Sequence, residues 1–373
     1  MRIVLTGGVT GGHIYPAIAI GDEFRKREPD TEILFIGSGD GLEEKIVPAH
    51  GYEMKTVTAK WVDRSNVFKL ADTLTKTAIG KEQAYRIIKK FKPDIVVSTG
   101  SYVSVPVVLG AHKYGAEIYL HEQNAYPGMA NKAMAKYARR VFVGFRDAAG
   151  KFKEAEKTVY SGNPVRGEFL NNDRAEARKK LGIPEGDFLI SAFGGSLGAE
   201  VLNGMISDVI SRFGGKDGIS IIFGTGRGHY DEVTADLEAR GIHDTKGVTV
   251  LPYISDMATV IAASNLVISR AGALTVAEIT VSGRASIFIP SPNVTADHQY
   301  YNAKAVADNG GTIIIREDEE AGERLLNTIE ELMHDEAVIA DMEKGSLASG
   351  VPNSAEIIYD AIKKDLEGDP VKC

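Results

Sequence analysis

The chain has 373 residues, which corresponds to about two domains at roughly 100–200 residues per domain. It carries 43 Lys and Arg residues against 51 Asp and Glu residues, and this net charge of −8 argues against a nucleic-acid-binding protein. The single cysteine, Cys373, excludes an internal disulfide and any multi-cysteine metal site. The sequence has no signal peptide and no run of roughly 18–20 apolar residues, so we expect a protein that is cytosolic or sits on a membrane surface.

The predicted elements alternate between short apolar runs and longer amphipathic segments. The first half contains predicted strands at residues 3–5, 33–36, 95–98, 118–120 and 141–143. The second half contains predicted strands at residues 188–193, 220–223, 248–251, 266–269, 286–289 and 312–315. Predicted helices lie at residues 14–27, 65–91, 200–212, 228–239, 273–282 and 298–308, and residues 319–366 are helical and acidic. Apolar strands that alternate with helices indicate parallel sheets covered on both faces.

Two segments have the strand, glycine loop and helix that begin a Rossmann-like domain. They are residues 3–13 (IVLTGGVTGGH) and residues 188–199 (FLISAFGGSLGA). A turn signal at residues 162–164 (Gly-Asn-Pro) interrupts the pattern between them. We therefore predict an α/β protein with two doubly wound parallel-sheet domains that join near this turn.

The first glycine loop predicts an anion-binding site. Its glycines let backbone N–H groups approach a diphosphate, and the following helix N-terminus adds partial positive charge. Their spacing matches neither the dinucleotide GxGxxG nor the Walker motif, which argues against an NAD enzyme and an ATPase. His13 stands where the helix starts and is a candidate general base, phosphate ligand or helix cap. The glycines are Gly7, Gly8, Gly11 and Gly12.

Two more loops of small residues follow predicted strands. Gly100, Ser101 and Tyr102 follow the strand at residues 95–98, so we expect this loop to line one cleft with the first loop. The third loop opens the second domain with Gly-x-Ser-x-Gly at residues 194–198. Its Ser196 is either a phosphate ligand, a helix cap or the nucleophile of a serine hydrolase, for which His298 is a candidate partner.

Polar residues after other strands are candidate binding groups. Glu278, in the helix that follows Arg270, can accept both hydroxyls of a ribose, but Thr275-x-x-Glu278 fits a capping box equally well. Gln299 offers an amide for sugar hydroxyls, with a polar helix start as the alternative. Residues 121–124 (His-Glu-Gln-Asn) follow a strand and form either a binding edge or a polar loop. No Asp-x-Asp or His-Glu-x-x-His motif occurs, so we predict no metal and no cofactor.

The segments TGGVTGGH, HEQN, GNPVR, GGSLGA, RAGALTVAE and HQYYNA occur in the order found in the MurG family, which the chain resembles over nearly its whole length. These are membrane-associated glycosyltransferases that add N-acetylglucosamine from UDP-N-acetylglucosamine to lipid I, an undecaprenyl-pyrophosphoryl-linked muramyl peptide, making lipid II of peptidoglycan. The resemblance implies the GT-B fold, in which two Rossmann-like domains face a cleft. It implies an acceptor- and membrane-side domain at residues 1–163 plus the C-terminal helix at 351–373, and a UDP-sugar-binding domain at residues 164–350. It also makes residues 194–198 a nucleotide loop rather than a nucleophile elbow.

The resemblance implies a role for each donor-site residue. Ile254 meets the uracil through its backbone, Glu278 holds the ribose hydroxyls and Gln299 contacts the sugar. Other donor-site residues lie near the diphosphate, present a helix N-terminus to it or reach the donor from the first domain. They are Thr10, Gly11, Gly12, Asn124, Arg166, Ser196, Arg270, Ala273, Leu274 and Thr275.

The acceptor side and the mechanism follow from the same resemblance. An α-linked donor and a β-linked product imply one inverting displacement, in which the C4 hydroxyl of the muramyl sugar attacks C1. We predict His13 as the base, with Glu122 as the alternative, and backbone N–H groups and a helix dipole as the stabilisers of the departing UDP. The chain departs from the family at Val9 and Ser101, where the family usually has glycine. The acceptor's diphosphate is assigned to Gly7, Gly8, Gly11, Gly12, Gly100, Ser101 and Tyr102.

Residues 60–92 form a basic segment in an acidic chain. They hold nine basic and three acidic residues, so they carry +6 and leave −14 for the rest of the chain. Taken alone, the pattern fits an amphipathic core helix with a solvated lysine face. Together with a lipid-linked acceptor, it predicts peripheral contact with an anionic membrane surface at the cytoplasmic face. The predicted membrane patch consists of Phe68, Lys69, Leu70, Leu74, Lys76, Ile79 and Lys81.

Five other functions remain as alternatives. They are a transferase with another acceptor such as diacylglycerol, an epimerase of UDP-N-acetylglucosamine, an NAD-dependent oxidoreductase, the serine hydrolase, and a nucleotide-sugar binder without turnover. Assays with donor and acceptor, covalent labelling of Ser196 and UDP-sugar binding without turnover separate them.

Overall fold

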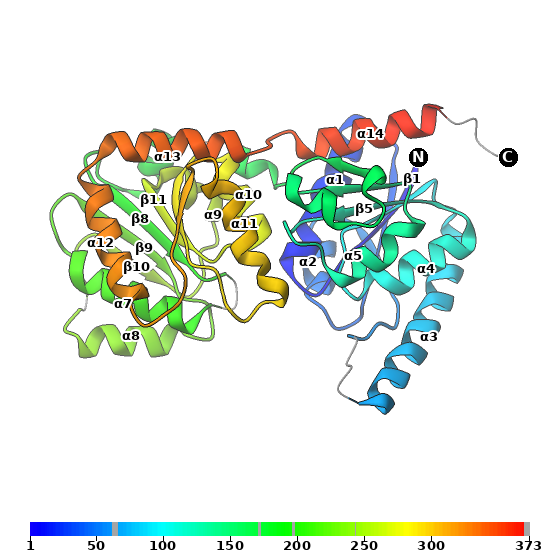
Figure 1. The fold of residues 1–373 in the computed structure, drawn as a ribbon, viewed down its shortest axis with the longest axis horizontal. Helices are drawn as coiled ribbons and strands as arrows, with labels where there is room; N and C mark the ends of the chain where they lie inside the picture. Colours follow the sequence, from blue (N-terminus) through cyan, green and yellow to red (C-terminus); the bar gives the residue numbers. More distant parts are fainter. Residues whose placement is uncertain (62–65, 171–172, 196–197, 243, 369–373) are drawn as a thin grey trace. The chain divides into compact units, whose positions relative to one another are not determined.

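The computed structural model describes residues 1–61, 66–170, 173–195, 198–242 and 244–368 (Figure 1). The chain divides into two compact units, Met1–Arg166 with Pro352–Cys373, and Gly167–Val351. Each unit contains a parallel β-sheet with helices packed on it, which confirms the predicted α/β class with two doubly wound sheets. The sequence analysis places the boundaries between residues 163 and 164 and between residues 350 and 351.

The sheet of the first unit has the strand order β3-β2-β1-β4-β5-β6-β7, and all neighbouring strands are parallel. Its strands are β1 (Arg2–Thr6), β2 (Glu32–Gly37), β3 (Glu53–Thr56), β4 (Ile95–Ser98), β5 (Glu117–Glu122), β6 (Arg140–Val143) and β7 (Thr158–Tyr160). Its α-helices are α1 (Gly11–Arg27), α2 (Glu43–Ala49), α3 (Val67–Phe91), α4 (Ser104–Tyr114), α5 (Met129–Met134) and α14 (Ser354–Gly368). Short 3₁₀ turns occur at Ala135–Tyr137, Arg146–Lys151 and Ala155–Lys157.

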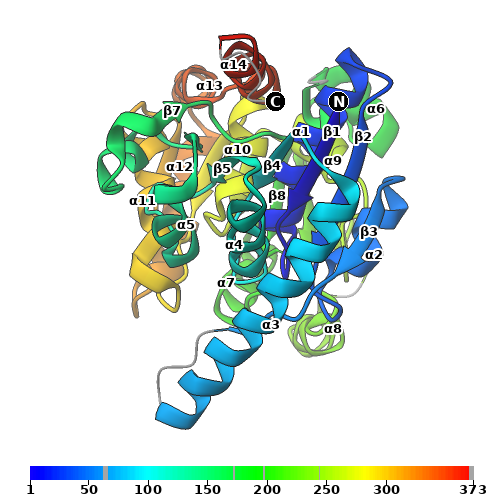
Figure 2. The same ribbon diagram turned by 90° about the vertical axis from the view of Figure 1, so that its right-hand side faces the viewer.

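The central strand β1 is buried on both faces, as its continuous apolar run predicts. Ile3 and Leu5 belong to a core that α1 covers, while Val4 belongs to a second core that α3 and α4 cover. All three side chains are fully buried. Helices α3 and α4 lie side by side in Figure 2. Because successive side chains of a strand point to opposite faces, an unbroken apolar run needs helices on both sides of the sheet.

The helix α14 packs on α1, and this contact places the last described residues in the first unit (Figure 1). Ile358 and Ile362 are fully buried in the core that α1 covers. The Tyr359 hydroxyl donates to Glu28 over 2.8 Å, and the Tyr359 ring stands edge-on to Phe24. The apolar stripe of α14 therefore completes one face of the first sheet.

We expect Asp365→Ala to lower the free energy of unfolding by about 3 kcal/mol, because it leaves the partner arginine without its buried carboxylate. Asp365 is 5% exposed and accepts from Arg140 Nε over 2.6 Å, which joins α14 to the edge of β6. Urea denaturation measures the change. The control is Asp360→Ala on the same helix, whose 65%-exposed side chain pairs with Arg27, and we expect it to cost less than about 1 kcal/mol. Equal costs for the two variants would contradict this role of Asp365.

The sheet of the second unit has the order β10-β9-β8-β11-β12-β13 and is also parallel throughout. Four of its strands, β10, β9, β8 and β11, can be followed in Figure 1. Its strands are β8 (Phe188–Phe193), β9 (Ile219–Gly224), β10 (Val248–Leu251), β11 (Leu266–Ser269), β12 (Ala285–Phe288) and β13 (Thr312–Ile314). Its α-helices are α6 (Arg174–Leu181), α7 (Glu200–Phe213), α8 (Tyr230–Ala239), α9 (Met257–Ala263), α10 (Ala273–Val281), α11 (His298–Ala307), α12 (Ala321–Met333) and α13 (Glu336–Ser349). Its 3₁₀ turns are Gly167–Leu170 and Thr295–Asp297.

Each sheet reverses its strand order at one point. In the first unit the reversal lies between β1 and β4, and in the second it lies between β8 and β11. Ligands of open parallel sheets bind beyond the carboxyl ends of the strands at such a switch point. The glycine loops singled out in the sequence follow β1 and β4 at the switch point of the first unit and β8 at that of the second.

Candidate functional site

The first and second loops pack against each other at the switch point of the first unit. The Thr99 backbone N–H donates to the Thr6 carbonyl over 2.8 Å, and the Thr99 hydroxyl donates to the His13 carbonyl over 2.6 Å. A Cβ at Gly7 would collide with the Thr99 hydroxyl, so only glycine allows this approach. The His13 ring lies beside Gly100, where an added Cβ would come 3.4 Å from Cδ2 of the imidazole. The structure thus brings together the two loops that the sequence predicts to be neighbours.

His13 is held at the start of α1 by its own loop. Thr10 is the N-cap residue of α1, and its carbonyl accepts from the His13 backbone N–H over 3.1 Å. The Thr10 hydroxyl lies 3.2 Å from Nδ1 of the half-buried His13 imidazole. A hydroxyl that fixes one ring nitrogen orients the other, as a general base requires. Thr10 occupies the N-cap position, so His13 is not the N-cap residue of α1.

The sequence analysis missed Glu43, which is the fully buried carboxylate beneath the first loop. Glu43 Oε2 accepts from the Val9 N–H over 2.8 Å, and Oε1 accepts from the N–H of Ser38 over 3.0 Å and from the Ser38 hydroxyl. Val9 has φ +74°, a left-handed conformation that costs a β-branched residue about 1–3 kcal/mol. The two departures from the family therefore share a feature, because Ser101 also has a positive φ of +69°.

Glu122 is buried at the end of β5 and organises the loop that follows it. Its carboxylate accepts from the backbone N–H groups of Asn124 (2.9 Å) and Gly128 (3.0 Å) and from the side-chain amides of Asn124 (3.2 Å) and Asn131 (2.9 Å). The Asn131 amide also lies beside Gly100, where an added Cβ would come 3.1 Å from its Nδ2. Glu122 is therefore linked through Asn131 to Gly100, the glycine that the His13 ring also approaches. No sequence signal singles out Asn131.

His121 is fully buried and neutral behind this loop. Gln123 Nε2 donates to His121 Nδ1 over 3.0 Å, and His121 Nε2 donates to the Gly162 carbonyl over 3.1 Å, which assigns the proton to Nε2. Burial lowers the pKa of His121 from 6.5 to about 4. Asn163 adds a hydrogen bond from its amide to the Gln123 carbonyl over 3.0 Å, so residues 162–164 support residues 121–124 from behind.

We expect the buried His121 to make the protein less stable as the pH falls from about 6.5 to 4. The unfolded chain takes up a proton at His121 near pH 6.5, whereas the folded chain resists protonation down to about pH 4. The stability that neutral His121 contributes is therefore fully present above pH 6.5. Below that pH the free energy of unfolding falls by about 1.4 kcal/mol per pH unit, so about 2 kcal/mol is lost between pH 7.5 and 5. Urea denaturation of wild type and His121→Gln at both pH values measures it, and equal pH dependence in the two proteins would contradict it.

The second loop connects the site to the segment before α3. Its Tyr102 ring stands edge-on to the exposed Trp61 ring, with centroids 6.1 Å apart. Burial and the nearby carboxylates of Asp40 and Glu43 raise the pKa of Tyr102, so its hydroxyl stays protonated and can donate a hydrogen bond.

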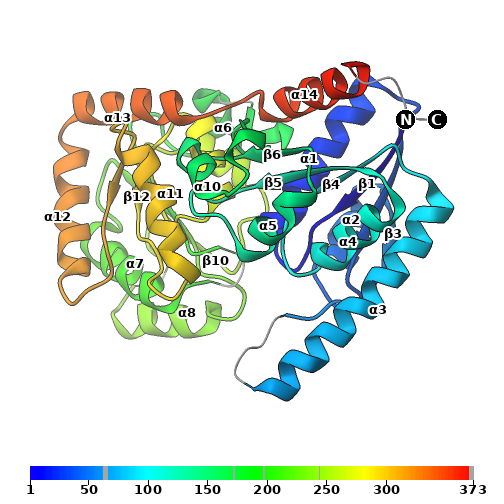
Figure 3. The ribbon, with the colours of Figure 1, turned by 45° about the vertical axis from the view of Figure 1, so that its right-hand side comes forward.

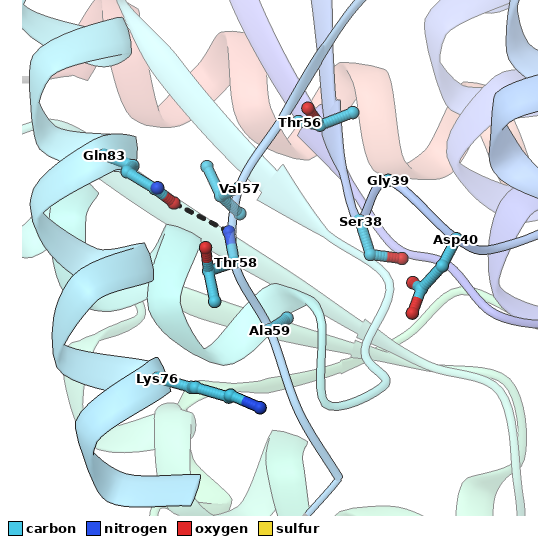
Figure 4. A pocket seen from close by; sticks show the side chains of 9 residues that line it. All are labelled: Ser38, Gly39, Asp40, Thr56, Val57, Thr58, Ala59, Lys76 and Gln83. Atoms are coloured by element: carbon cyan, nitrogen blue, oxygen red, sulfur yellow. Dashed lines mark hydrogen bonds between the residues drawn. The ribbon is translucent and has the colours of Figure 1, made fainter. Parts of the chain in front are cut away.

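A pocket of about 400 Å³ lies beside these loops in the first unit (Figure 4). Ser38, which binds Glu43, forms part of its wall, and the Thr58 N–H closes another side by donating to Gln83 Oε1 over 2.7 Å. Lys76 of α3 reaches the pocket from the other side. The pocket is lined by Ser38, Gly39, Asp40, Thr56, Val57, Thr58, Ala59, Lys76 and Gln83.

In the second unit, the third loop leads from β8 into α7. Ser196 lies outside the described residues. Gly198 has φ +78°, and a Cβ there would lie 2.7 Å from the His229 ring and would collide with the Thr225 carbonyl. The loop is thus packed closely against the residues that follow β9. Its helix α7 has Ala199 at the N-cap position without a side-chain cap.

The loop after β11 places Arg270 and the start of α10 at the same switch point. Arg270 is largely buried, ion-paired with Glu317, and donates to the Ile289 carbonyl over 3.0 Å. The fully buried Asn302 of α11 donates to the Ala271 carbonyl over 3.1 Å and so fixes the turn. Arg270 therefore lies directly after β11 at the switch point, with part of its charge neutralised by Glu317.

The structure decides one alternative for α10. The N-cap residue is Gly272, so Thr275 is already in the first turn and the capping-box interpretation of Thr275 and Glu278 is wrong. Glu278 is half-buried one turn further along. The helix begins with Ala273, Leu274 and Thr275, and its N-cap residue Gly272 supplies no side-chain cap.

The remaining predicted donor residues occupy both units. Ile254 is buried in the loop after β10, and Gln299 in α11 accepts from the Ser291 N–H over 2.9 Å, which orients its amide. Asn124 and Arg166 belong to the first unit. The Arg166 guanidinium lies 4.6 Å from the ring centroid of Tyr15, a residue of α1. Among the residues that the structure describes, no group of three or more His, Cys, Asp and Glu side chains is placed to hold a metal ion.

Comparison with known proteins gives matches over both units. Residues 3–143 match the glycosyltransferase family 28 N-terminal domain, and residues 189–358 match its C-terminal domain. A relative from Acetivibrio thermocellus is 40% identical over 97% of this chain and 98% of its own length, and one from Clostridioides difficile is 40% identical over 98% and 89%. Both are named UDP-N-acetylglucosamine–N-acetylmuramyl-(pentapeptide) pyrophosphoryl-undecaprenol N-acetylglucosamine transferase.

Solved structures agree with these matches. The crystal structure of Acinetobacter baumannii MurG is 26% identical, has a TM-score of 0.76 and covers 97% of this chain and 99% of its own, in agreement with the predicted GT-B class. A UDP-GlcNAc 2-epimerase from Neisseria meningitidis has a TM-score of 0.71 at 11% identity over 98% and 100% of the two chains, so it shares the fold alone. The chain belongs to the MurG family of UDP-N-acetylglucosamine-dependent glycosyltransferases.

Proposed function

We propose that this protein transfers N-acetylglucosamine from UDP-N-acetylglucosamine to lipid I, giving lipid II and UDP in peptidoglycan synthesis. The observation that carries the proposal is 40% identity, over 97% of the chain, to a transferase named for this reaction. The glycine loops at both switch points support it, because donor and acceptor each carry a diphosphate that backbone N–H groups can bind.

The second unit binds the donor in this proposal. Ile254 takes the uracil through its backbone, Glu278 accepts the ribose hydroxyls, and Gln299 uses its oriented amide on the sugar. The N-termini of α7 and α10, whose N-cap residues supply no side-chain cap, face the diphosphate and stabilise the charge that develops on the departing UDP. No metal is needed for that step.

The first unit binds the acceptor in this proposal, and His13 is the catalytic base. The C4 hydroxyl of the muramyl sugar attacks C1 of N-acetylglucosamine, UDP leaves from the opposite side, and the hydroxyl proton passes to the imidazole. Attack opposite to the leaving group inverts the α-linked donor to a β-linked product. The four donors on Glu122 favour a role in shaping the loop, which leaves His13 as the preferred base.

Transfer is tested with UDP-N-acetylglucosamine and a short-chain lipid I analogue. We expect UDP to be released only when the acceptor is present, together with a disaccharide on the acceptor. Formation of a C2 epimer without acceptor would instead indicate an epimerase, and UDP binding without turnover would indicate a binder.

We also propose that α3 and the segment before it contact an anionic membrane surface. The first half of α3 extends beyond the rest of its unit, and its Leu74 and Ile79 are 62% and 47% exposed (Figures 2 and 3). Trp61, 56% exposed, adds an aromatic side chain that prefers an interface. Lys69, Lys76 and Lys81 add positive charge, while the side chain of Phe68 is not among those described. Within the described residues, no helix is both long and apolar enough to cross a membrane.

Charge reversal of Lys69, Lys76 and Lys81 to Glu is expected to weaken binding to anionic vesicles by about 1 kcal/mol or more per lysine. Activity should fall with a full-length lipid-linked acceptor in vesicles and stay near wild type with a short-chain soluble acceptor. The matched control reverses the exposed Lys179, Lys246 and Lys344 of the second unit. Equal losses on both acceptors would contradict membrane contact, as would unchanged vesicle binding.

A further inference from the structure

We infer that Glu43 is a positioning residue of the transfer reaction, which holds the first glycine loop in the shape that aims His13. The inference rests on the proposed function for its effect on activity. The contact that it invokes lies within the first unit, between the carboxylate at the start of α2 and the Val9 N–H in the loop after β1.

The carboxylate of Glu43 is buried beneath the loop and hydrogen-bonded to it. It is 0% exposed, and a buried carboxylate requires hydrogen bonds to compensate its lost hydration. Both oxygens are used, one by Val9 and the other by Ser38. Glu43 therefore ties the loop after β1 to the loop after β2.

Three glycines surround the Glu43 side chain, each at a position where an added Cβ would clash with it. A Cβ at Gly8 would lie 2.7 Å from Glu43 Oε1, one at Gly37 would lie 2.8 Å from its Cγ, and one at Gly41 would collide with its Oε2. Part of the glycine content of the first loop thus serves the approach of a side chain, because Gly8 must lack a Cβ for Glu43 to reach the Val9 N–H.

The hydrogen bond between Glu43 and Val9 matters for the loop because Val9 is strained. A valine at φ +74° relaxes towards negative φ unless a contact holds it, and the bond to Glu43 is that contact. The next residue, Thr10, is the N-cap residue of α1, and its hydroxyl lies 3.2 Å from Nδ1 of the His13 imidazole. Release of Val9 therefore rotates the peptide that carries Thr10 and disturbs the orientation of His13, although Glu43 touches neither substrate.

The test removes the carboxylate that accepts the hydrogen bond from Val9 but keeps the volume of the side chain. Glu43→Met keeps the volume and the helix preference of the side chain but accepts no hydrogen bond from Val9. We expect kcat/KM for the lipid-linked acceptor to fall about 10- to 100-fold, the scale of a charge-assisted hydrogen bond, with KM for UDP-N-acetylglucosamine within about twofold. The matched control, Glu44→Met, changes the exposed neighbouring carboxylate and should leave both values within about twofold of wild type.

A second substitution separates positioning from general damage. Val9→Gly accepts φ +74° without strain, so in the Glu43→Met background it should restore at least about fivefold of the lost kcat/KM. Glu43→Gln, which retains one acceptor oxygen, should lose less activity than Glu43→Met. Failure of Val9→Gly to restore activity would overturn the inference.

A readout independent of activity tests the same contact. In protein labelled with ¹⁵N-valine, we expect the Val9 amide to exchange at least about tenfold faster in Glu43→Met than in wild type, while the buried Val96 and Val97 amides of β4 stay protected. An unchanged exchange rate of the Val9 amide would overturn the inference. If the β4 amides also lose protection in Glu43→Met, the variant is generally destabilised, and the same exchange rates are measured in Glu43→Gln instead. If wild type transfers no sugar, the proposed function fails, yet the Val9 exchange rate still decides whether Glu43 holds the loop.

Discussion

Replacement of His13 by alanine is expected to lower kcat about 10²- to 10⁴-fold, the usual contribution of a positioned general base. Without the imidazole, the C4 hydroxyl of the acceptor must lose its proton to water while it attacks C1. The His13 ring stands at the start of α1, beside Gly100 of the second loop and within reach of the Thr10 hydroxyl. Its loss removes a reacting group and leaves the second unit untouched, so KM for UDP-N-acetylglucosamine should stay within about threefold.

Steady-state kinetics with a soluble lipid I analogue measures this effect. The control is His334→Ala, an exposed histidine of the second unit, which should retain wild-type kinetics. A Thr10→Val variant should show a smaller loss in kcat, because it leaves the imidazole in place but removes the hydroxyl beside Nδ1. If His13→Ala keeps kcat within threefold of wild type, the base lies elsewhere and Glu122 becomes the next residue to test.

Replacement of Glu278 by alanine is expected to weaken UDP binding about 100-fold. A hydrogen bond from a ribose hydroxyl to a carboxylate contributes about 1.5–3 kcal/mol. Two such bonds at the low end of this range contribute about 3 kcal/mol, which corresponds to about a 100-fold change in Kd. Because α10 begins at Ala273 with Gly272 as its N-cap, the helix does not use the Glu278 side chain as part of a capping box. The loss should therefore fall on donor affinity and not on the capping of α10.

Titration calorimetry with UDP measures the Kd, and thermal unfolding of the unliganded protein measures the stability. Glu278→Gln should lose less affinity than Glu278→Ala, since its amide oxygen still accepts one hydroxyl. The exposed Glu331→Ala on α12 is the control and should bind UDP as wild type does. A Kd for Glu278→Ala within threefold of wild type would contradict the ribose assignment.

The fold follows from the sequence wherever a strand is central. Every strand predicted from an apolar run is present. The central strands are buried on both faces and must be apolar throughout, whereas β10 and β13, at the edges of the second sheet, are apolar but only partly buried. The two unpredicted strands, β3 (Glu53–Thr56) and β7 (Thr158–Tyr160), lie at opposite edges of the first sheet. Their side chains are exposed or half-buried, so neither needs an apolar run and neither leaves a signal in the sequence.

The candidate site was only partly predictable, for a physical reason. Glycine loops after strands and polar residues at strand ends can be found along the chain, and they led to His13 and Glu278. Glu43 and Asn131 act across loops that are distant in sequence, since Glu43 lies 34 residues from Val9 and Asn131 lies 9 residues from Glu122. The positive φ of Val9 is equally invisible, because a valine predicts an extended or helical backbone and only the tertiary contact holds it otherwise.

Transfer of N-acetylglucosamine to the C4 hydroxyl of the muramyl sugar is tested most directly by NMR of the product made from UDP-N-acetylglucosamine and a soluble lipid I analogue. We expect one new disaccharide, with the diaxial anomeric coupling of a β-linkage and a through-bond correlation from its anomeric proton to C4 of the muramyl ring. An α-anomeric coupling, a correlation to another ring position or UDP release without any disaccharide would contradict it.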